Sequence, residues 1–539
     1  MAEKGRKKVT CGVALMRLLK AHGVDTVFGM PGVHTLELYR SLNEIGIKHV
    51  GVRHEQGAGF MADGYARVSG KPGVCVLISG PGVTNAATPI GQAYSDSVPM
   101  IVLSSVAARR DLRMGRGRLH EISRQDDVTA PITAFSATVL EPNDVPELVA
   151  RAYATFAAAR PRPVHIALPL DVITAEADFP PTPRVVPGVP LPDPRGMDAA
   201  VELLAAARRP AIIVGGGAAR HGKHVLAIAE KIGAAVVPTI AGKGVIPDDH
   251  PLAVNATMDR EATQKFLAKT DLLLVVGSEL AEPDLWTEPV PHGGKLIRID
   301  IDPTVVTRDS SPDVAILGDA GTALKGIAKR LAPRNDAGPG FNKGGEVKAL
   351  RQAEMAALTP LEKKHVKVLG ALRQVLPEDG FVFTDMTQIA YSGYGLFGCV
   401  RPNTWFFPAG YGTLGFAVPA AIGAAIAAPE RPAVALVGDG GFQFTMQELG
   451  TAVEQKLPLA IVLWNNDALA QIRDGFVNRG IEPISVVQHN PDFLMIAKAY
   501  GCRAVRAESL EHFQAQLRAA WKADGPTVVE VREDSAFLT

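Results

Sequence analysis

Short apolar runs alternate with amphipathic stretches along this chain. Near the start, Leu15, Leu18 and Leu19 have the spacing of one helix face. Further on, Val74–Ile78 and Met100–Leu103 are almost continuously apolar and are bounded by Gly or Pro. Such runs are typical of strands buried on both faces of a parallel sheet. The opening third of the chain therefore predicts an α/β domain.

The same alternation recurs through the middle and the end of the chain. We expect further strands at Thr26–Phe28, Ala211–Val214, Ala235–Pro238, Leu272–Val276, Leu296–Ile299, Val434–Val437, Ala460–Leu463 and Thr527–Val531. Strands that alternate with helical stretches favour βαβ units, in which consecutive strands run parallel. No short-period repeat and no low-complexity tail interrupts the pattern.

Two segments break this alternation. Phe179–Gly196 is dense in proline, and Leu331–Gly345 is dense in glycine, proline and polar residues. Both compositions favour extended chain that packs no core of its own. They divide the chain into three predicted domains, at residues 1–180, 190–333 and 350–539. The fold class we expect is α/β, with three doubly wound and mainly parallel sheets.

Composition narrows the classes of function. The 539 residues carry 56 Lys and Arg against 56 Asp and Glu, and a chain without net charge or a basic, aromatic-rich stripe is not expected to bind nucleic acid. No uncharged apolar stretch of about 20 residues predicts a membrane helix, and the basic start lacks the apolar run of a signal peptide. The four cysteines are scattered, which predicts a cytoplasmic protein without a disulfide framework or zinc site.

The third predicted domain contains the most informative motif. The strand Val434–Val437 runs into Gly438-Asp439-Gly440-Gly441, and the strand Ala460–Trp464 ends in Asn465-Asn466. We expect a helix between them, at about Thr445–Glu454, which completes one βαβ unit. In open α/β sheets, ligands bind in the crevice at the carboxyl ends of the strands, and both polar segments lie there.

The residue types in this motif suit a metal and a phosphate. Asp439 and Asn466 offer hard oxygen ligands of the kind that Mg²⁺ takes in proteins. Gly438, Gly440 and Gly441 lack a Cβ atom, so their backbone N–H groups can approach a phosphate. The start of the following helix adds a favourable dipole. Either half of the motif alone is common in ordinary turns, but together the two halves predict a diphosphate and metal site.

Two further strings of residues lie far from this motif along the chain. The predicted strand His49–Arg53 leads into His54-Glu55-Gln56, followed by Gly57–Arg67, which reads GAGFMADGYAR. The segment Gly410–Ala420 reads GYGTLGFAVPA. By itself, a glutamate before a helix usually lies on the surface, where the helix dipole favours it.

Together, the strings around Glu55, Gly412 and Asp439 resemble the thiamine-diphosphate-dependent enzymes, in particular the acetolactate synthase-like family. The resemblance covers essentially the whole chain, in the order pyrimidine-binding, central Rossmann-like and diphosphate-binding domain. It implies thiamine diphosphate and Mg²⁺ as cofactors and a 2-oxo acid, a small molecule, as substrate. It also implies a homodimer or homotetramer with active sites between chains, so that Glu55 of one chain meets Asp439 and Asn466 of another.

The resemblance also assigns roles to single residues. It implies that Glu55 hydrogen-bonds the pyrimidine ring of the cofactor and promotes its imino tautomer. The Gly412 carbonyl would accept a hydrogen bond from the 4′-amino group, and Leu414 would lie as a wedge between the two cofactor rings. The residues that it places around Mg²⁺ and the diphosphate are Asp439, Asn466, Ala468 through its carbonyl, Gln388, Gly438, Gly440 and Gly441.

The reaction that the resemblance implies is loss of CO₂ from a 2-oxo acid, through a carbanion–enamine intermediate on the cofactor. Protonation of that intermediate releases an aldehyde, whereas its attack on a second carbonyl makes an acetohydroxy acid. The first outcome defines a decarboxylase. The second defines an acetolactate synthase, which stays the main alternative.

Several departures favour the decarboxylase, and the likeness is greatest to the type that acts on 5-guanidino-2-oxopentanoate (2-ketoarginine). Val275–Trp286 lacks the arginine-rich pattern that contacts flavin in the synthases, so bound FAD is disfavoured. His120-Glu121-Ile122 stands in place of a Phe-Gln-Glu run, and Gly475 stands in place of a tryptophan. The stretches Gly117–Glu121 and Arg473–Ile484 are more similar to the guanidino-acid group.

Acidic side chains near the substrate would suit a cationic tail, since a carboxylate can pair with guanidinium through two hydrogen bonds. Glu121, Asp467 and Asp474 are the candidates, although each alone is more often a solvated or structural carboxylate. His120 is a candidate proton donor, although a lone His in a loop often has no such role. The adjacent His–His pair of pyruvate decarboxylases is absent, which disfavours simple pyruvate decarboxylation.

Two other classes of function stay open. Gly215-Gly216-Gly217 follows the strand Ala211–Val214 and could mark the dinucleotide site of a flavin or nicotinamide oxidoreductase, but its spacing is not GxGxxG. The other class is a catalytically silent binding homologue. The intact set of Glu55, Asp439 and Asn466 argues against that class.

Overall fold

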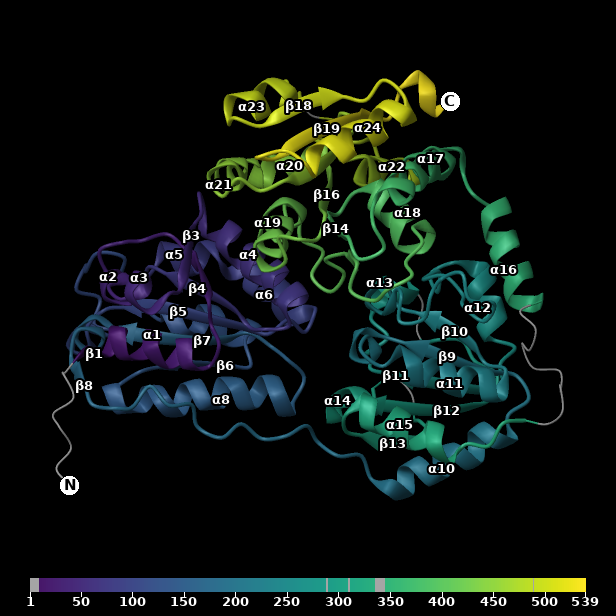
Figure 1. Cartoon of the computed structure of the whole chain (residues 1–539), viewed down its shortest axis with the longest axis horizontal. Helices are drawn as coiled ribbons and strands as arrows, with labels where there is room; N and C mark the ends of the chain where they lie inside the picture. Colours follow the sequence, from purple (N-terminus) through teal and green to yellow (C-terminus); the bar gives the residue numbers. More distant parts are fainter. Residues whose placement is uncertain (1–8, 287–288, 309–310, 335–344, 488) are drawn as a thin grey trace.

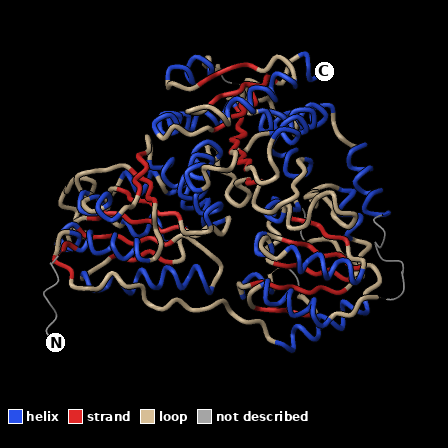
Figure 2. Tube along the Cα trace, viewed as in Figure 1, coloured by secondary structure: helices blue, strands red, loops and turns tan. Residues whose placement is uncertain are grey.

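The computed structural model describes residues 9–286, 289–308, 311–334, 345–487 and 489–539. The chain forms three lobes arranged as a triangle (Figure 1). In each lobe, helices pack on the faces of a sheet whose neighbouring strands are parallel (Figure 2). The three lobes confirm the predicted fold class, an α/β protein with three parallel-sheet domains.

The N-terminal lobe has a six-stranded sheet with the order β3-β2-β4-β5-β7-β6. Its strands are β2 (Thr26–Gly29), β3 (Lys48–Gly51), β4 (Gly73–Leu77), β5 (Met100–Val106), β6 (Phe135–Thr138) and β7 (Val164–Pro169). Its helices are α1 (Cys11–Ala21), α2 (Leu36–Tyr39), α3 (Leu42–Ile45), α4 (Glu55–Ser69), α5 (Pro81–Asn85), α6 (Ala87–Ser95), α7 (Gln125–Thr129), α8 (Val145–Ala158) and α9 (Leu170–Ile173). Strands β1 (Val9–Thr10) and β8 (Glu176–Ala177) form a separate antiparallel pair.

The central lobe has a five-stranded sheet with the order β10-β9-β11-β12-β13. Its strands are β9 (Pro210–Val214), β10 (Ala235–Pro238), β11 (Leu272–Val276), β12 (Lys295–Asp300) and β13 (Val314–Leu317). Its helices are α10 (Pro194–Ala206), α11 (Gly222–Ile232), α12 (Glu261–Leu267), α13 (Glu282–Leu285), α14 (Pro303–Val306) and α15 (Ala320–Arg330).

The C-terminal lobe has a six-stranded sheet with the order β15-β14-β16-β17-β19-β18. Its strands are β14 (Phe381–Thr384), β15 (Trp405–Phe406), β16 (Ala433–Gly438), β17 (Leu459–Asn465), β18 (Arg503–Arg506) and β19 (Thr527–Arg532). Its helices are α17 (Pro360–Val375), α18 (Gln388–Leu396), α19 (Ala417–Ala427), α20 (Asp439–Thr445), α21 (Leu449–Glu454), α22 (Ala470–Asn478), α23 (Phe493–Ala499) and α24 (Leu510–Ala520). None of the helices in the described ranges is long and apolar enough to cross a membrane.

The two segments between the lobes differ in detail from the predicted linkers. The first ends earlier than expected, because α10 begins at Pro194 and the Asp193 side chain caps its first turn. Most of the second lies outside the described residues. It is followed by α16 (Gly345–Ala356), whose Val347 and Leu350 pack into the core of the central lobe.

The helix expected at about Thr445–Glu454 begins earlier in the chain. Helix α20 starts at Asp439, directly after β16, and a short 3₁₀ turn separates it from α21. The glycines that suggest a loop instead form the first turn of this helix. Gly441 packs so closely on the Asp385 carboxylate that an added Cβ would lie 3.0 Å from it. Close packing therefore explains at least one of these glycines.

One continuous hydrophobic core joins the N-terminal and C-terminal lobes, with α4 packed directly against α19. Glycines make this approach possible: a Cβ on Gly64 would lie 1.9 Å from the Ala420 carbonyl oxygen, and one on Gly423 would lie 1.9 Å from that of Met61. Because Glu55 is the first residue of α4, this contact fixes where Glu55 stands relative to the C-terminal lobe.

We expect His165 to make the N-terminal lobe sensitive to acid. Its imidazole is fully buried in β7 and bonded to Ser104, Thr129 and Ser136 at 2.7–2.8 Å, and burial lowers its pKa to about 4. An unfolded His binds its proton near pH 6.5. The contribution to stability is therefore complete above pH 6.5 and declines as pH falls toward 4, by up to about 3 kcal/mol.

Thermal unfolding between pH 7.5 and 4.5 tests this expectation at fixed protein concentration. His165→Asn should lower the melting temperature at pH 7.5 but flatten its decline in acid. His292→Gln, in a loop of the central lobe, serves as the control and should keep the wild-type slope. Equal slopes for wild type and His165→Asn would show that His165 does not set the acid limit.

Candidate active site

The motif residues of the C-terminal lobe gather where the parallel strands β14, β16 and β17 end. Asp439 is the buried first residue of α20, and Asn466 directly follows β17. The register places Gly438 of β16 beside Trp464 of β17, so the two polar segments emerge side by side. This is the edge at which open α/β sheets bind ligands.

Three side-chain oxygens converge at this edge on one amide group. The Asn490 Nδ2 group donates to Asp439 Oδ2 at 2.7 Å, to Asp467 Oδ1 at 3.2 Å and to Asn465 Oδ1 at 3.3 Å. Gln443 donates in turn to Asn490 Oδ1 at 3.1 Å. Burial raises the pKa of Asp439, while Asn490 and the Gly440 N–H favour its ionised form. A cluster of oxygens around one donor marks a point of negative potential that suits a cation.

The remaining predicted metal ligands lie on the segment after β17. The Asn466 amide nitrogen donates to Glu533 Oε2 at 3.1 Å, which turns its amide oxygen the opposite way. Ala468 is buried and pairs with Val487 in an isolated antiparallel bridge. Asp467, between Asn466 and Ala468, has a positive φ of 56°. In the described ranges, no three His, Cys, Asp or Glu side chains form a metal cluster. A cation here would thus need amide and carbonyl oxygens as well.

Asp385 holds the loop that carries Gly412 and Leu414. It follows β14, is completely buried, and accepts hydrogen bonds from the backbone N–H groups of Met386 and Gly415 at 2.8–3.1 Å. Burial raises the pKa of this carboxyl to about 7. Gly412 has a φ of 65°, a left-handed conformation that glycine adopts without strain. Gly412 is exposed and Leu414 half-buried, so both can face a ligand.

The N-terminal lobe helps to hold the same loop. The Asp96 carboxylate accepts a hydrogen bond from the Gly410 N–H at 2.8 Å, and the Gln92 amide oxygen accepts one from the Thr413 hydroxyl at 3.0 Å. Arg67 donates to the same carboxylate at 2.8 Å and fixes its position. Contacts between lobes of one chain therefore set the position of the Gly412–Leu414 segment.

Gln388 lies at the start of α18 and faces α22. Its amide nitrogen donates to Asp474 Oδ2 at 3.0 Å and to Gln471 Oε1 at 3.3 Å. Its amide oxygen is buried, and no donor among the described residues reaches it. A buried oxygen without a donor is costly, so a ligand that brings a donor would stabilise this arrangement. The structure thus places Gln388 beside Asp474, one of the acidic candidates.

Glu55 stands at the matching edge of the N-terminal sheet. Its carboxylate is only 9% exposed and accepts a hydrogen bond from Asn85 Nδ2 at 3.0 Å. The residues just before it are fixed from the C-terminal lobe, because Glu448 accepts hydrogen bonds from the Arg53 and His54 N–H groups at 3.0–3.2 Å. These bonds also explain why β3 ends at Gly51 and not at Arg53. Within the described ranges, no hydrogen bond joins Glu55 to Asp439, Asn466 or Gly412 of the same chain.

The loop that carries His120 and Glu121 lies beside β5, near the turn at Gly80. His120 has a positive φ of 61°. The Glu121 carboxylate accepts hydrogen bonds from the backbone N–H groups of Arg116 and Arg118, which lower its pKa. The Glu121 carboxylate is therefore already bonded to the backbone of its own loop. Asp467 is engaged as well, because Arg532 binds it at 2.6 Å.

Three residues of this arrangement are not singled out by the sequence: Asp385, Glu448 and Asn490. Each contacts a motif residue from a distant part of the chain, and nothing in its local sequence marks it. Glu448 came nearest to detection, since it lies within the helix predicted beside the glycine motif. Long-range contacts of this kind are visible only once the lobes are packed.

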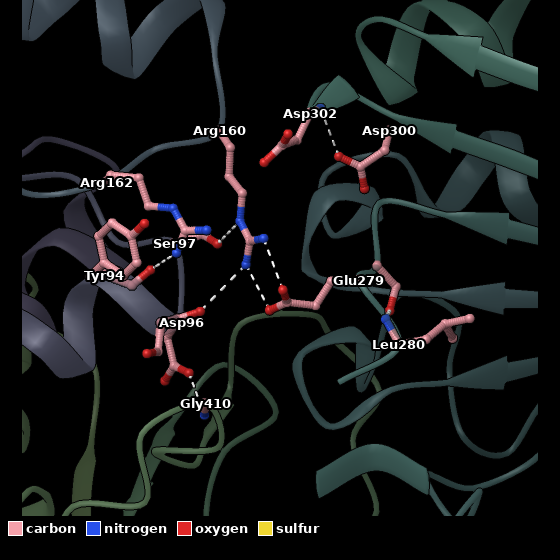
Figure 3. Close-up of polar contacts among 12 residues, drawn as sticks. Tyr94, Asp96, Ser97, Arg160, Arg162, Glu279, Leu280, Asp300, Asp302 and Gly410 are labelled. Carbon is pink, nitrogen blue, oxygen red and sulfur yellow. Dashed lines mark hydrogen bonds and ion pairs between the residues drawn. The ribbon is translucent and has the colours of Figure 1, made fainter. Parts of the chain in front are cut away.

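The glycines of Gly215-Gly216-Gly217 have a packing role. A Cβ on Gly215 would lie 2.2 Å from the Gly277 carbonyl oxygen, and one on Gly217 would lie 2.8 Å from the Gly277 Cα. The loops after β9 and β11 therefore touch backbone to backbone. A cavity of about 460 Å³ lies beside them, where residues of all three lobes meet. Arg160 borders it and donates to Glu279 at 2.7 and 2.9 Å and to Ser97 at 2.7 Å (Figure 3).

Comparison with known proteins identifies the class. Residues 9–129 match the N-terminal TPP binding domain of thiamine pyrophosphate enzymes, residues 197–327 match their central domain, and residues 385–531 match their C-terminal TPP binding domain. The chain belongs to the thiamine pyrophosphate enzymes, and thiamine diphosphate is the cofactor of its site.

Individual relatives cover nearly the whole chain. A probable 2-ketoarginine decarboxylase of Pseudomonas aeruginosa is 50% identical over 98% of this chain and 95% of its own length. An acetolactate synthase of Arthrospira platensis is 33% identical over 98% and 94%. The acetolactate synthase large subunit of Corynebacterium glutamicum is 32% identical over 99% and 89%.

Proposed function

We propose that this enzyme removes CO₂ from a 2-oxo acid with a guanidino tail, such as 2-ketoarginine, and releases the aldehyde. The main support for this proposal is the 50% identity with a probable 2-ketoarginine decarboxylase along nearly all of both chains. The two synthases are only 33% and 32% identical. The departures at His120-Glu121-Ile122 and Gly475 point the same way.

The C-terminal edge fits a metal-bound diphosphate. Asp439 would supply a carboxylate oxygen to Mg²⁺, Asn466 its amide oxygen and Ala468 its carbonyl, a set of hard oxygens. The convergence of oxygens on the Asn490 amide supports a cation at this point. Gly438, Gly440 and Gly441 let Thr387, Leu469 and Asp385 pack against the backbone at the helix start, where N–H groups would face phosphate oxygens. The buried Gln388 oxygen, which no donor among the described residues reaches, can accept a hydrogen bond from a bound group. Bound thiamine diphosphate supplies an acidic carbon that adds to the 2-oxo group and takes up the electron pair that CO₂ leaves.

Glu55 is suited to hydrogen-bond a pyrimidine nitrogen. It is buried, and the bond from Asn85 holds one of its oxygens in place. The other oxygen lies near Gly82, where an added Cβ would be only 3.6 Å away. A planar ring could approach over this glycine more easily than over a larger residue. On the opposite side, the Gly412 carbonyl and the Leu414 side chain would position the ring that Glu55 activates.

A second copy of the chain would complete each site. Both ligand-binding edges expose large apolar side chains, which on a stable protein mark an interaction surface. On the N-terminal lobe these are Met30, Val33, Leu36, Met114 and Leu119; on the C-terminal lobe they are Tyr411, Phe444, Ile472, Val477, Ile481, Ile484 and Val487. Pairing the two edges between chains would cover these side chains and bring Glu55 of one chain to Asp439 of the other. A dimer is the smallest assembly that does so, and a tetramer contains two.

Asp474 is the acidic residue best placed to receive the guanidinium tail. Glu121 is bonded to its own loop and Asp467 to Arg532. Asp474 is paired with the neighbouring Arg473 at 3.0 Å, but its other oxygen faces Gln388 at the edge of the diphosphate site. Gly475 directly after it leaves room where a tryptophan would narrow the space. We also propose that the enzyme works without flavin, because Val275–Trp286 lacks the arginine-rich pattern of the synthases, and because Arg160 at the interlobe cavity is already paired with Glu279.

A substrate screen tests this proposal. Purified enzyme with thiamine diphosphate and Mg²⁺ would be given 2-ketoarginine, pyruvate, branched and aromatic 2-oxo acids, and both CO₂ and the mass of the organic product would be recorded. We expect 4-guanidinobutanal from 2-ketoarginine at the highest kcat/KM. Acetolactate from pyruvate as the main product would overturn the decarboxylase in favour of a synthase.

A further inference from the structure

Each of the two asparagines of the metal motif is bonded to a glutamate at the end of β19. Asn465 Nδ2 donates to Glu530 Oε1 at 2.7 Å. Asn466 Nδ2 donates to Glu533 Oε2 at 3.1 Å. Glu530 lies within β19, and Glu533 directly follows that strand. The two glutamates lie 65 and 67 residues beyond their asparagines, so no local motif connects them.

A carboxylate decides which way a neighbouring amide group turns. The nitrogen and the oxygen of an asparagine side chain have almost the same shape, so packing alone does not choose between the two orientations. An ionised carboxylate offers only acceptors, and an amide can therefore face it only with its nitrogen. Each glutamate thus turns the amide oxygen of its asparagine away from β19.

The Asn465 oxygen in turn holds the segment that carries the metal ligands. It accepts hydrogen bonds from the Asp467 backbone N–H at 3.2 Å and from Asn490 Nδ2 at 3.3 Å. The first bond closes the turn directly before the Ala468 carbonyl, and the second leads through Asn490 to Asp439. A reversed Asn465 amide would place its N–H groups against two other donors, and both bonds would be lost.

The two glutamates are fixed by partners of their own. The Glu530 side chain is only 3% exposed, and its second oxygen accepts a hydrogen bond from Arg506 Nε on β18 at 2.7 Å. Such a partner offsets the cost of burying a charge. The Glu533 N–H donates to the Asn465 carbonyl at 3.0 Å, and the Glu533 carbonyl accepts from Lys364 Nζ at 3.0 Å. Both carboxylates therefore stand in place before a ligand binds.

We propose that Glu533 is a positioning residue of the metal site, because it fixes the Asn466 amide so that its oxygen faces Mg²⁺. Glu530 has the same role for Asn465, whose oxygen holds the turn that follows. The Asn466 oxygen receives no hydrogen bond from the described residues, which leaves it available to a cation. This inference rests on the proposed placement of Mg²⁺ between Asp439 and Asn466.

Glu533→Gln tests this role with almost no change in shape. The glutamine amide can face Asn466 with its oxygen or with its nitrogen, so the Asn466 amide is no longer held in one orientation. Glu508→Gln is the matched control for the loss of one negative charge, because Glu508 is 85% exposed in the turn before α24. Full-length protein with saturating thiamine diphosphate would be titrated with Mn²⁺, and free Mn²⁺ would be measured by electron paramagnetic resonance. CO₂ release at increasing Mg²⁺ concentration gives kcat.

We expect Glu533→Gln to weaken Mn²⁺ binding by about 10- to 100-fold, while kcat at saturating Mg²⁺ stays within a few-fold of wild type. Glu530→Gln should weaken Mn²⁺ binding by about 10-fold, since it acts through Asn465. If Glu530→Gln does not fold, Arg506→Gln replaces it, because Arg506 is half exposed and its loss leaves the buried side chains in place.

Wild-type Mn²⁺ affinity in Glu533→Gln would overturn the proposal. An equal loss of affinity in Glu508→Gln would also overturn it, because a general loss of negative charge would then explain the effect. Lower kcat at unchanged affinity would show that Glu533 does not act on the metal. If Asp439→Asn bound Mn²⁺ as tightly as the wild type does, the proposed metal site itself would be wrong.

Discussion

Replacing Glu55 with Gln should lower turnover by a factor of about 10³ or more and leave the fold intact. The amide keeps the shape of the buried carboxylate, and its oxygen can still accept the hydrogen bond from Asn85. What it loses is the ability to hold a proton at the pyrimidine ring, without which the cofactor is not activated. The effect should fall on kcat, because the diphosphate and metal contacts that dominate cofactor binding lie on the other lobe.

Steady-state CO₂ release gives the rate, and calorimetric titration with thiamine diphosphate gives the affinity. Thermal unfolding should differ from wild type by no more than a few degrees, since the substitution is isosteric. Glu147→Gln, on the exposed face of α8, is the matched control for loss of one negative charge. Wild-type turnover in Glu55→Gln would refute the proposed role of Glu55.

The patterns that predict the three sheets are strong because parallel sheets need both faces covered. Runs such as Leu272–Val276 and Val434–Val437 are apolar throughout, and the structure places them as central, completely buried strands. Ends of elements are harder to predict, because they depend on distant partners. Strand β3 stops at Gly51 because the N–H groups of Arg53 and His54 donate to the Glu448 carboxylate. Helix α20 begins directly at Asp439 because Gly441 can pack on Asp385.

The candidate site likewise contains residues that the sequence predicts well and residues that it does not. Residues inside long strings, such as Glu55 and Asp439, can be singled out from the sequence, because several neighbours support each one. Supporting residues are harder to single out, because they lie far from the residues they hold: Asn490 lies 51 positions beyond Asp439, and Asp385 lies 30 positions before Gly415. Single acidic residues are weaker still, since a local sequence does not show whether a carboxylate is already paired. Only the packed structure shows that Arg532 binds Asp467.

Asp439→Asn should separate stability from cofactor binding. Burial raises the pKa of Asp439, so its charge is costly before a cation arrives, and the isosteric amide removes that cost. We expect the cofactor-free variant to melt at or above the wild-type temperature. Thiamine diphosphate with Mg²⁺ should raise the melting temperature of the wild type by mass action and have almost no effect on the variant.

An Asn490 variant shows whether the loss of cofactor binding comes from the missing charge of Asp439. Asn490→Ala removes a group that orients Asp439 without removing a charge, and loss of such a supporting bond typically weakens metal binding 10- to 100-fold. We therefore expect Asn490→Ala to keep cofactor-induced stabilisation, but only at higher Mg²⁺ concentration, whereas Asp439→Asn should not recover it at any concentration reached. If Asp439→Asn bound Mg²⁺ and cofactor as the wild type does, the cation would have to lie elsewhere, and the convergence of oxygens on Asn490 would be purely structural.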